Sequence, residues 1–312
     1  MKLKIILNPY SNRGGAGKQA ERVQRLCQQA GLDFDLALTH RPGEAIDLAR
    51  QARLDGFDVV AAAGGDGTVS EVVNGLVQAT PPDQPVGSLA VFPLGSGNDF
   101  ADMLGIPHRP EVCVQMIQQA RTRQVDLGRA QITNADQSSM VRYFDNNMGL
   151  GFEAQVTVES RKIQRLRGFA IYLVAVLRSL RAYEQPHFQV AWTDEAGQEH
   201  QVAHRSLLVS LGNSRRTGGG FYITPDAEMD DGLLDIAIAQ ALTTPRILML
   251  LPKVLRGAHR NDPAVRLVRC RTAQIRVSAP VPVHLDGEVV SEEAQGASVS
   301  LEPGRLTVLV PG

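Results

Sequence analysis

The residues best suited to chemistry stand in one short stretch, Gly64-Gly65-Asp66-Gly67-Thr68. An apolar run at 58–63 predicts a buried strand before this stretch, and residues 69–79 predict a helix after it. A glycine turn between a strand and a helix lets backbone N–H groups approach an anion, and the helix N-terminus adds a positive field. Because Asp66 would repel a bare phosphate, the stretch indicates a metal–nucleotide site. The alternative is an ordinary glycine turn.

A second glycine turn, Leu94-Gly95-Ser96-Gly97-Asn98-Asp99, brings a hydroxyl, an amide and a carboxylate to the end of another expected strand. It forms either a second wall of the same site or a simple cap for the next helix. A third turn, Gly14-Gly15-Ala16-Gly17-Lys18, suits phosphate oxygens because it places glycines and a cation at an expected helix start. It is not a Walker phosphate loop, because Asn12 and Gln19 stand where that motif needs Gly and Ser or Thr.

Two further groups of carboxylates lie late in the chain. Five carboxylates fall within residues 226–235. This oxygen-rich cluster suits Mg²⁺ or Ca²⁺, and a solvated turn before a strand is the alternative. The run His284-Leu285-Asp286-Gly287-Glu288 ends an expected strand. Either Asp286 or Glu288 could act as a general base near a substrate hydroxyl. Asp-Gly is also a strong hairpin signal, which is the alternative for this run.

Two helical stretches combine apolar and basic side chains. Their apolar centres lie at 169–176 and 248–251. Their basic residues are Arg161, Lys162, Arg165, Arg167, Arg178 and Arg181 in the first stretch, and Arg246, Lys253, Arg256 and Arg260 in the second. Basic amphipathic helices can lie on anionic membrane surfaces. Core helices with solvated outer faces are the alternative.

The elements that must position these residues change in type near residue 125. Before it, expected strands alternate with expected helices, which predicts a parallel sheet covered on both faces. The loops at 8–17, 64–68 and 94–99 all follow strands, so they should gather at one edge of the sheet. After it, many short β-like runs predict an antiparallel sandwich or barrel-like domain, interrupted by helical stretches at 153–181 and 244–255. We expect two closely packed domains with a cleft between them.

Composition narrows the class of protein. The chain has 312 residues, of which 43% are hydrophobic, and a net charge of −1. No global charge excess draws it to nucleic acid, and we expect no nucleic-acid partner. Cys27, Cys113 and Cys270 lie far apart without CxxC spacing, which fits a reducing cytoplasm rather than a disulfide framework. No apolar run approaches the roughly 18 residues of a membrane span.

The motifs together resemble a known family. They are NP-x-S-x-x-x-G from Asn8, GGDGT-x-x-E-x-x-N-G at 64–75, P-x-G-S-x-NDFA at 93–101, DDG-x-LD at 230–235 and LDGE at 285–288. This order is similar to that of the bacterial diacylglycerol kinase-like lipid kinases, which are related to sphingosine kinases. GGDGT alone is shared with NAD kinases and phosphofructokinases. Its combination with NDFA and a late LDGE is far more specific, and the resemblance covers nearly the whole chain.

The resemblance implies an α/β, three-layer nucleotide-binding domain over residues 1–128 and a β-rich, sandwich-like lipid-substrate domain over 129–301. The C-terminal segment, about 302–312, could pack back on the first domain. ATP and Mg²⁺ are the implied cofactors. The residues implied to line the nucleotide site are Asn8, Thr39, Gly64, Gly65, Asp66, Gly67, Thr68, Val69, Ser70 and Ser96. Ser96 stands where threonine is commoner in the family, and the hydroxyl is kept.

The resemblance also implies catalytic and metal residues. Asp66 would lie near Mg²⁺, Glu288 matches the proposed proton acceptor, and Asp286 lies beside it. Asp231 matches a metal-binding side chain, and the backbone carbonyls of Glu228 and Leu233 would complete that site.

The implied activity is transfer of the γ-phosphate of ATP to a lipid hydroxyl. From the cysteines and the basic amphipathic stretches we expect a cytoplasmic location, with peripheral contact at the inner membrane surface. An NAD kinase-like enzyme with a soluble substrate is one alternative, and a nucleotide-binding regulatory protein without catalysis is another. The identity of the lipid and the oligomeric state stay open at this point.

Overall fold

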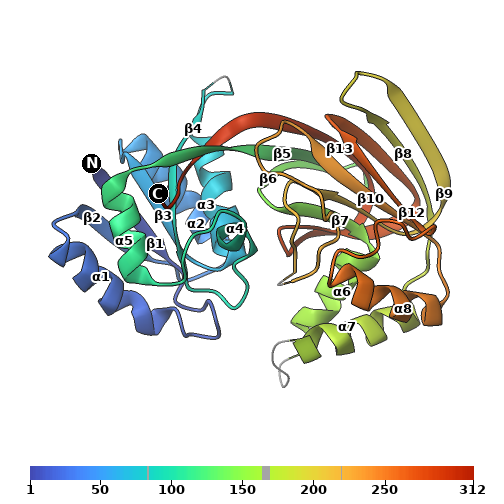
Figure 1. Cartoon of the computed structure of the whole chain (residues 1–312), viewed down its shortest axis with the longest axis horizontal. Coiled ribbons are helices and arrows are strands. Elements are labelled where there is room, and N and C mark those ends of the chain that lie inside the picture. Colours follow the sequence, from blue (N-terminus) through green and yellow to red (C-terminus); the bar gives the residue numbers. More distant parts are fainter. Residues whose placement is uncertain (83, 164–168, 219) are drawn as a thin grey trace. The chain divides into compact units, whose positions relative to one another are not determined.

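A computed structural model describes residues 1–82, 84–163, 169–218 and 220–312. The chain divides into two compact units, one formed by residues 1–127 with 302–312 and the other by residues 128–301. Two long strands, β5 (Thr122–Asn134) and β13 (Glu288–Leu309), carry the chain from one unit to the other (Figure 1). The C-terminal segment therefore belongs to the same unit as the N-terminus.

The first unit is built on a parallel sheet with the strand order β2-β1-β3-β4-β13. Its strands are β1 (Lys2–Leu7), β2 (Asp33–Leu38), β3 (Val59–Gly64), β4 (Val86–Pro93) and the last part of β13. All six residues of β3 are buried, as expected for a central strand that is covered on both faces. This is the parallel sheet that the alternation of apolar runs predicted.

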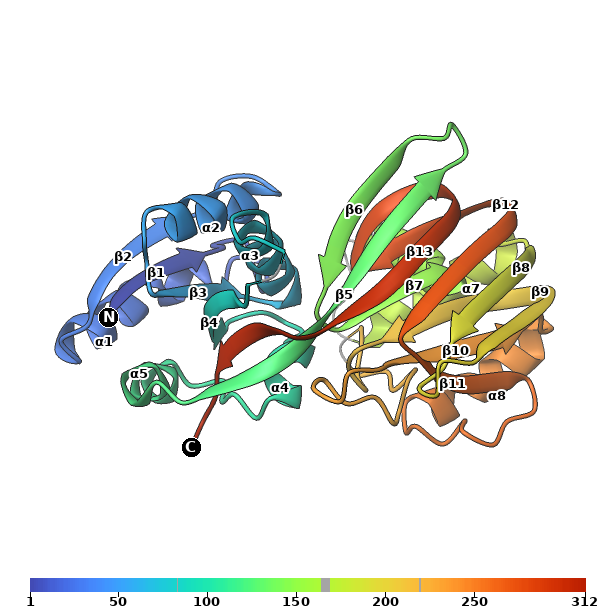
Figure 2. The same cartoon turned by 90° about the horizontal axis from the view of Figure 1, so that it is seen from above.

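Helices cover both faces of this sheet and complete three layers. The helices are η1 (Gly17–Gln19), α1 (Ala20–Gln29), α2 (Glu44–Leu54), α3 (Asp66–Gln78), α4 (Asp99–Met103) and α5 (Pro110–Gln119). Helix α2 packs on α3, and α1 packs on α5. Figure 2 shows the first pair on one face of the sheet and the second pair on the other.

The second unit is β-rich and mainly antiparallel. The order β11-β10-β9-β7-β12-β13 forms its main path, β8 pairs with both β9 and β12, and β5 pairs with β6 and β13. The strands not yet given bounds are β6 (Ser139–Phe144), β7 (Asn147–Gly151), β8 (His187–Thr193), β9 (Glu199–Gly212), β10 (Leu234–Gln240), β11 (Val265–Cys270) and β12 (Thr272–Leu285). These strands surround an apolar core that includes Phe144, Phe188 and Trp192.

Three helices cover part of the second unit: α6 (Phe152–Arg161), α7 (Phe169–Ala182) and α8 (Thr244–Val254). The helical region expected over 153–181 contains two helices, α6 and α7, which pack against each other. Arg165 and Arg167, part of the basic stretch noted in the sequence, lie outside the described residues. None of the helices in the described ranges is both long and apolar enough to cross a membrane.

Candidate active site

The loops with chemical side chains begin at one edge of the parallel sheet. Leu7 pairs with Leu38 and with Ala63, and Gly64 pairs with Pro93. The residues that follow these strand ends are therefore neighbours in space. The expectation that the glycine loops gather at the carboxyl edge of the sheet is confirmed.

Asp66 is the first residue of helix α3, directly after the extended Gly65. Its Oδ1 accepts a hydrogen bond from the Phe100 backbone N–H at 3.1 Å, which ties the first glycine loop to the second. Burial raises the pKa of Asp66, the nearby Asp102 carboxylate adds to that rise, and backbone N–H groups of Phe100 and Asp99 oppose it. A half-buried carboxyl group with a raised pKa at a helix N-terminus is a candidate functional group.

The side chains of Asn8 and Thr68 join the end of β1 to the first turn of α3. Asn8 Nδ2 lies 3.3 Å from Thr68 Oγ1, and Ser11 Oγ lies 3.5 Å from the same oxygen. Thr39 follows β2 at the same edge, with its backbone N–H bonded to the Leu7 carbonyl. Thr68, Ser70 and Thr39 are buried. The structure thus brings Asn8, Thr39 and Thr68 to one edge, beside the glycine turn.

The two glycine loops pack so closely that side chains would separate them. A Cβ built on Gly95 would lie 2.3 Å from the Gly65 Cα. Asn98 closes the second loop, because its side chain accepts from the Gly95 N–H at 3.0 Å and donates to the Gly95 carbonyl at 3.2 Å. Asn98 stands at the N-cap position of α4 but makes no side-chain cap bond. Ser96 stays exposed at the tip of the loop.

Three residues of this edge were not among the predicted site residues. Ser11 contacts Thr68, and Asn98 shapes the loop that holds Ser96. Glu71 accepts hydrogen bonds from the backbone N–H groups of Gly43 and Ala45, at 2.9 and 3.2 Å, and so fixes α3 to the start of α2. Glu71 and Asn98 are part of the quoted motifs, so the motif spacing was the signal that could have identified them.

Asp286 and Glu288 lie in the second unit, in the hairpin that joins β12 to β13. Leu285 pairs with Glu288, and both turn residues between them have positive φ, 49° at Asp286 and 79° at Gly287. This is the hairpin that the Asp-Gly signal predicted as an alternative. Glu288 is half-buried.

The Asp286 carboxylate accepts hydrogen bonds from the backbone of a segment that is distant in the sequence. Its oxygens accept hydrogen bonds from the N–H groups of Asp145, Asn146 and Asn147 at 3.1, 2.9 and 2.9 Å. The side chain is 7% exposed. Asp286 therefore anchors the hairpin to the start of β7, and little of its lone-pair capacity is left for a substrate.

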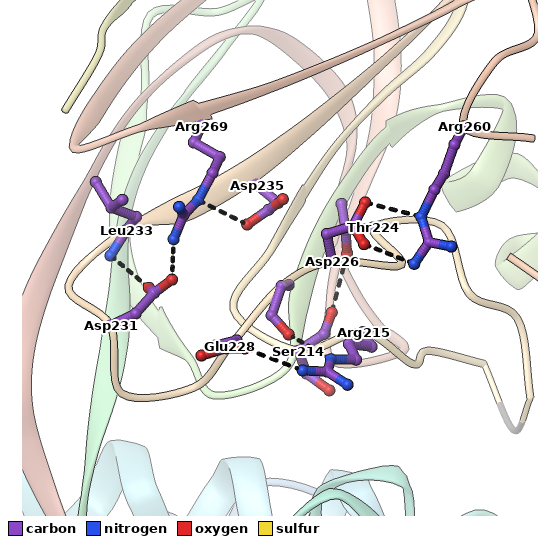
Figure 3. Close-up of polar contacts among 11 residues, drawn as sticks. Ser214, Arg215, Thr224, Asp226, Glu228, Asp231, Leu233, Asp235, Arg260 and Arg269 are labelled. Carbon is purple, nitrogen blue, oxygen red and sulfur yellow. Dashed lines mark hydrogen bonds and ion pairs between the residues drawn. The ribbon is translucent and has the colours of Figure 1, made fainter.

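The carboxylates of the acidic loop before β10 form ion pairs with arginines (Figure 3). Asp226 forms an ion pair with Arg260 at 2.6 Å, and Glu228 with Arg215 at 3.2 Å. Asp231 contacts the Arg269 guanidinium through Oδ2, while its Oδ1 accepts from the Leu233 N–H at 3.0 Å.

Asp235, the last carboxylate of this cluster, is the one most strongly affected by its surroundings. Burial raises the pKa of Asp235 to about 7 against the opposing charge of Arg269, and the neighbouring carboxylates add to the rise.

The expected metal residues are Glu228, Asp231 and Leu233, and Arg269 contacts the one side chain among their ligands, the Asp231 carboxylate. A cation bound by Asp231 would have to displace the guanidinium that its carboxylate now contacts. No cluster of three or more His, Cys, Asp or Glu side chains with metal-site geometry occurs among the described residues. The absence of such a side-chain cluster does not test the expected metal site, because two of the three expected ligands are backbone carbonyls.

An apolar cavity of about 210 Å³ lies within the second unit. Helices α6, α7 and α8 and strands β9 and β10 supply most of its lining. Strand β10 shows how the sequence builds it, because Ile236 and Ile238 point into the main core while Ala237 and Ala239 line the cavity. Gly287, between Asp286 and Glu288, also lines the cavity. The hairpin with the candidate proton acceptor therefore borders an apolar pocket.

The basic residues of helix α8 are partly engaged inside the second unit. Arg246 and Lys253 pair with the buried Asp262 at 2.6 and 3.0 Å. On α7, Arg178 and Arg181 are exposed, next to Leu173 and Leu177, whose exposed fractions are 43% and 44%. Helix α8 also exposes apolar side chains, Leu248 at 37% and Met249 at 58%, so both stretches combine exposed apolar and basic residues.

Two family models match the chain. The model of the diacylglycerol kinase catalytic domain matches residues 2–130. The model of the YegS C-terminal NAD kinase beta sandwich-like domain matches residues 146–310. Together they cover most of both units.

Full-length relatives agree with these matches. A diacylglycerol kinase of Mycobacterium tuberculosis is 30% identical over 311 residues, covering 99% of this chain and 95% of that protein. A "Probable lipid kinase YegS-like" protein of Chromohalobacter salexigens is 32% identical over 292 residues, covering 93% of this chain and 88% of that protein.

Solved structures of other proteins are similar to this chain in fold. The crystal structure of a diacylglycerol kinase from Bacillus anthracis has a TM-score of 0.69 at 21% identity and covers 99% of this chain and 97% of its own. A yeast NADH kinase structure has a TM-score of 0.52 at 11% identity, covering 100% of this chain and 84% of its own. At these identities the likeness concerns the fold alone.

Proposed function

The chain belongs to the diacylglycerol kinase-like lipid kinases, and from this premise we propose that it transfers the γ-phosphate of ATP to a hydroxyl of a lipid, with Mg²⁺ as the divalent cation. The observation that carries the choice of substrate is the apolar pocket of the second unit, which Gly287 borders. A lipid chain would fill such a pocket, whereas a soluble dinucleotide would gain nothing from it. The likeness to a yeast NADH kinase supports a shared fold and not that substrate.

In this proposal the edge of the parallel sheet holds the nucleotide. The residues assigned to it are Asn8, Thr39, Gly64, Gly65, Asp66, Gly67, Thr68, Val69, Ser70 and Ser96. The support is that Asn8 and Thr68 contact each other and that α3 begins at Asp66, so its first backbone N–H groups face the loop. Such N–H groups bind phosphate oxygens, and the exposed Ser96 hydroxyl can add a further donor.

The surroundings of Asp66 suit a hard divalent cation. Carboxylate oxygens are the ligands that Mg²⁺ prefers, and the raised pKa of Asp66 means that a nearby positive charge would favour its ionised form. When bound, Mg²⁺ offsets charge on the transferring phosphoryl group. Asp66 would hold the cation and Phe100 would hold Asp66 in position through its backbone N–H.

We assign the proton acceptor to Glu288. Asp286 is the weaker candidate, because its oxygens already accept three backbone hydrogen bonds. Glu288 is half-buried and follows the pocket-lining Gly287, so it would take the proton of a lipid hydroxyl whose chain lies in the pocket.

A transfer assay tests the proposal as a whole. The full chain is incubated with γ-labelled ATP and Mg²⁺ against diacylglycerol, monoacylglycerol, phosphatidylglycerol, a sphingoid base and a ceramide, with NAD in parallel. We expect label on at least one lipid and none on NAD, and no transfer when a chelator removes the divalent cation. Transfer to NAD alone would identify the soluble-substrate alternative, and nucleotide binding without any transfer would identify a regulatory protein.

A larger side chain in the pocket is expected to weaken the use of the lipid substrate without changing the affinity for the nucleotide. The Ala239→Phe variant places a ring in the cavity lining, and we expect kcat/KM for the lipid to fall at least about tenfold, since losing even 1.4 kcal/mol of binding is a tenfold effect. Nucleotide affinity, measured by calorimetry, should stay unchanged. The matched control is Gln240→Phe, one residue further along β10, where the side chain is exposed. Equal lipid kinetics in the two variants would argue against this pocket.

We propose a second metal at Asp231, with the backbone carbonyls of Glu228 and Leu233. Because Arg269 contacts the Asp231 carboxylate, Arg269→Ala should strengthen divalent-cation binding. An exposed ion pair of this kind is worth up to about 1 kcal/mol, so the expected gain is about two- to fivefold. Titration calorimetry with Mg²⁺ and Ca²⁺ measures it, and Arg260→Ala, which frees Asp226 instead, is the control. Binding that survives Asp231→Asn undiminished would rule this site out.

We further propose that the protein works in the cytoplasm, at the inner membrane surface. The support is helix α7, where Leu173 and Leu177 lie one turn apart beside the exposed Arg178 and Arg181. The three free, buried cysteines agree with a reducing compartment.

A vesicle-binding experiment tests the membrane contact. Replacing Leu173 and Leu177 together with Glu should weaken partitioning onto phosphatidylglycerol-containing vesicles at least about tenfold, because each buried leucine contributes about 1.5–3 kcal/mol. Co-sedimentation measures the effect, and high salt should weaken the wild-type protein as well. The control is Leu54→Glu, an exposed leucine of helix α2 in the first unit. If both variants bind vesicles equally, α7 is not the contact.

A further inference from the structure

The apolar pocket of the second unit follows helix α6 from one end to the other. The residues of α6 that line the pocket recur at helical spacing from Phe152 to Arg161. At about 1.5 Å per residue, the pocket runs along this helix for about 14 Å. The pocket is therefore deep, and each end of α6 contributes to its lining.

The mouth of the pocket lies at the C-terminal end of α6. Arg161 and Gly287 line the pocket, and both are exposed. The Arg161 Nη2 atom donates a hydrogen bond to the Gly287 carbonyl at 3.4 Å, so these two residues stand together. Because Glu288 follows Gly287 in the hairpin, a headgroup at this mouth would lie beside the candidate proton acceptor.

The closed end of the pocket is a cluster of buried apolar side chains around Ala239. The other members are Phe152, Val176, Leu207 and Ile247, and all five line the pocket. Each of them is 3% or 4% exposed, and they come from helices α6, α7 and α8 and strands β9 and β10. A group that reaches this end leaves water, and it must be apolar because burial of an unpaired polar group is costly.

Small side chains on β10 leave this space open. Ala237 and Ala239 line the pocket from the strand, while Ile247 and Leu250 line it from α8. Protein interiors are close-packed, and voids larger than a water molecule are few. A cavity of about 210 Å³ among these residues therefore indicates a site for an apolar ligand.

The volume of the cavity limits how much of a lipid it can hold. An apolar cavity of about 150 Å³ holds one benzene molecule, which has six carbon atoms. On the same scale, about 210 Å³ holds about eight carbon atoms. Because this volume is spread along the length of α6, the pocket is narrow as well as deep. One aliphatic chain fills it, and no room is left for a second chain beside the first.

We propose that the pocket binds a single aliphatic chain of the lipid and selects chains of about eight carbons. The inference rests on the proposed lipid-kinase function and names its substrate class: a lipid that is recognised through one chain of this length. The methyl end of the chain lies against Ala239, and the headgroup stays at Arg161 and Gly287. A second chain, and the carbons of a longer chain that exceed this length, stay outside the pocket and add little affinity.

Binding of a chain-length series without ATP tests this inference separately from catalysis. The probes are butanoyl-, hexanoyl-, octanoyl-, decanoyl- and dodecanoylglycerol, each with one acyl chain and each kept below the concentration at which it aggregates. Displacement of a fluorescent fatty acid from the full-length protein measures their affinities. We expect the affinity to rise about fourfold with each added methylene up to about eight carbons, and to change less than about twofold beyond that length. Dioctanoylglycerol, with two chains, should bind within about threefold of octanoylglycerol.

Two variants and a control test the closed end of the pocket. Ala239→Val adds two carbon atoms there and Ala239→Leu adds three, so the affinity should stop rising at about six and about five carbons. The smaller Ala239→Val change keeps the test open if Ala239→Leu does not fold, and thermal melting checks both. Gln240→Leu is the matched control, since this side chain is exposed on the same strand, and it should level off at about eight carbons like the wild type.

An affinity that rises with the same slope up to dodecanoylglycerol would overturn the inference. So would a much tighter binding of dioctanoylglycerol than of octanoylglycerol, or a folded Ala239 variant that levels off at the same chain length as the wild type. A series that levels off as expected, without phosphate transfer to any lipid, would instead count against the kinase assignment and leave the single-chain pocket standing.

Discussion

Replacing Asp66 with Asn is expected to abolish phosphate transfer, with a loss of at least about 10³-fold in kcat/KM, while the protein stays folded. The carboxylate is assigned to the divalent cation at the edge of the sheet, and an amide offers that cation a neutral oxygen instead. The bond from the Phe100 N–H can persist, because the Asn carbonyl also accepts it. Steady-state transfer to the best lipid of the panel measures the loss.

The Asp66→Asn variant should lose activity without losing stability. Burial raises the pKa of Asp66, so the folded protein binds this proton more tightly than the unfolded chain does. Stability from this group is present below the ordinary pKa and is lost as the pH rises through the raised one. At neutral pH an ionised Asp66 is disfavoured in the folded protein, which lowers stability. An uncharged Asn removes this cost, so the melting temperature of the variant should be equal to or higher than that of the wild type. Asp47→Asn, a surface carboxylate of α2, is the control. More than about a tenth of wild-type activity in Asp66→Asn would refute the role.

Glu288→Gln is expected to slow transfer by about 10²–10⁴ without loss of stability. Glu288 meets Leu285 in the hairpin through the backbone, so an amide at this position leaves the turn intact. Single-turnover transfer measures the chemical step.

Asp286→Ala should behave differently, because Asp286 holds the hairpin in place. It would leave the N–H groups of residues 145–147 without their acceptor. Hydrogen bonds to a charged group contribute about 1.5–3 kcal/mol each, so we expect the free energy of unfolding to fall by at least about 3 kcal/mol in urea titrations. If Asp286→Asn lost activity at full stability while Glu288→Gln stayed active, the two assignments would have to be exchanged.

Much of the first unit could be predicted from local pattern. The strand expected at 58–63 is β3, and the helix expected at 69–79 is α3, which begins three residues earlier. These assignments succeed because side-chain periodicity and glycine turns act over a few residues. The region expected to be helical over 153–181 does contain helices, but helical periodicity alone did not show that they are two, α6 and α7, which pack against each other.

The acidic loop shows what local pattern leaves undecided. Five carboxylates in ten residues indicated a cation site, yet Arg215, Arg260 and Arg269 neutralise three of them. Two of these arginines come from segments more than thirty residues away. No spacing rule links such residues, because only the fold brings them into contact.

By itself the sequence determined the order of strands and helices, the glycine loops at the strand ends and the family to which the chain belongs. Those properties depend on neighbouring residues, and the chain carries them before it folds. Only the tertiary structure decided the surroundings of each carboxylate: Asp286 accepts backbone N–H groups about 140 residues away, and Glu153 pairs with His284 in the lining of an apolar pocket. The physical reason is that the charge, burial and hydrogen bonding of a side chain are set by whatever surrounds it, and distant segments supply those surroundings.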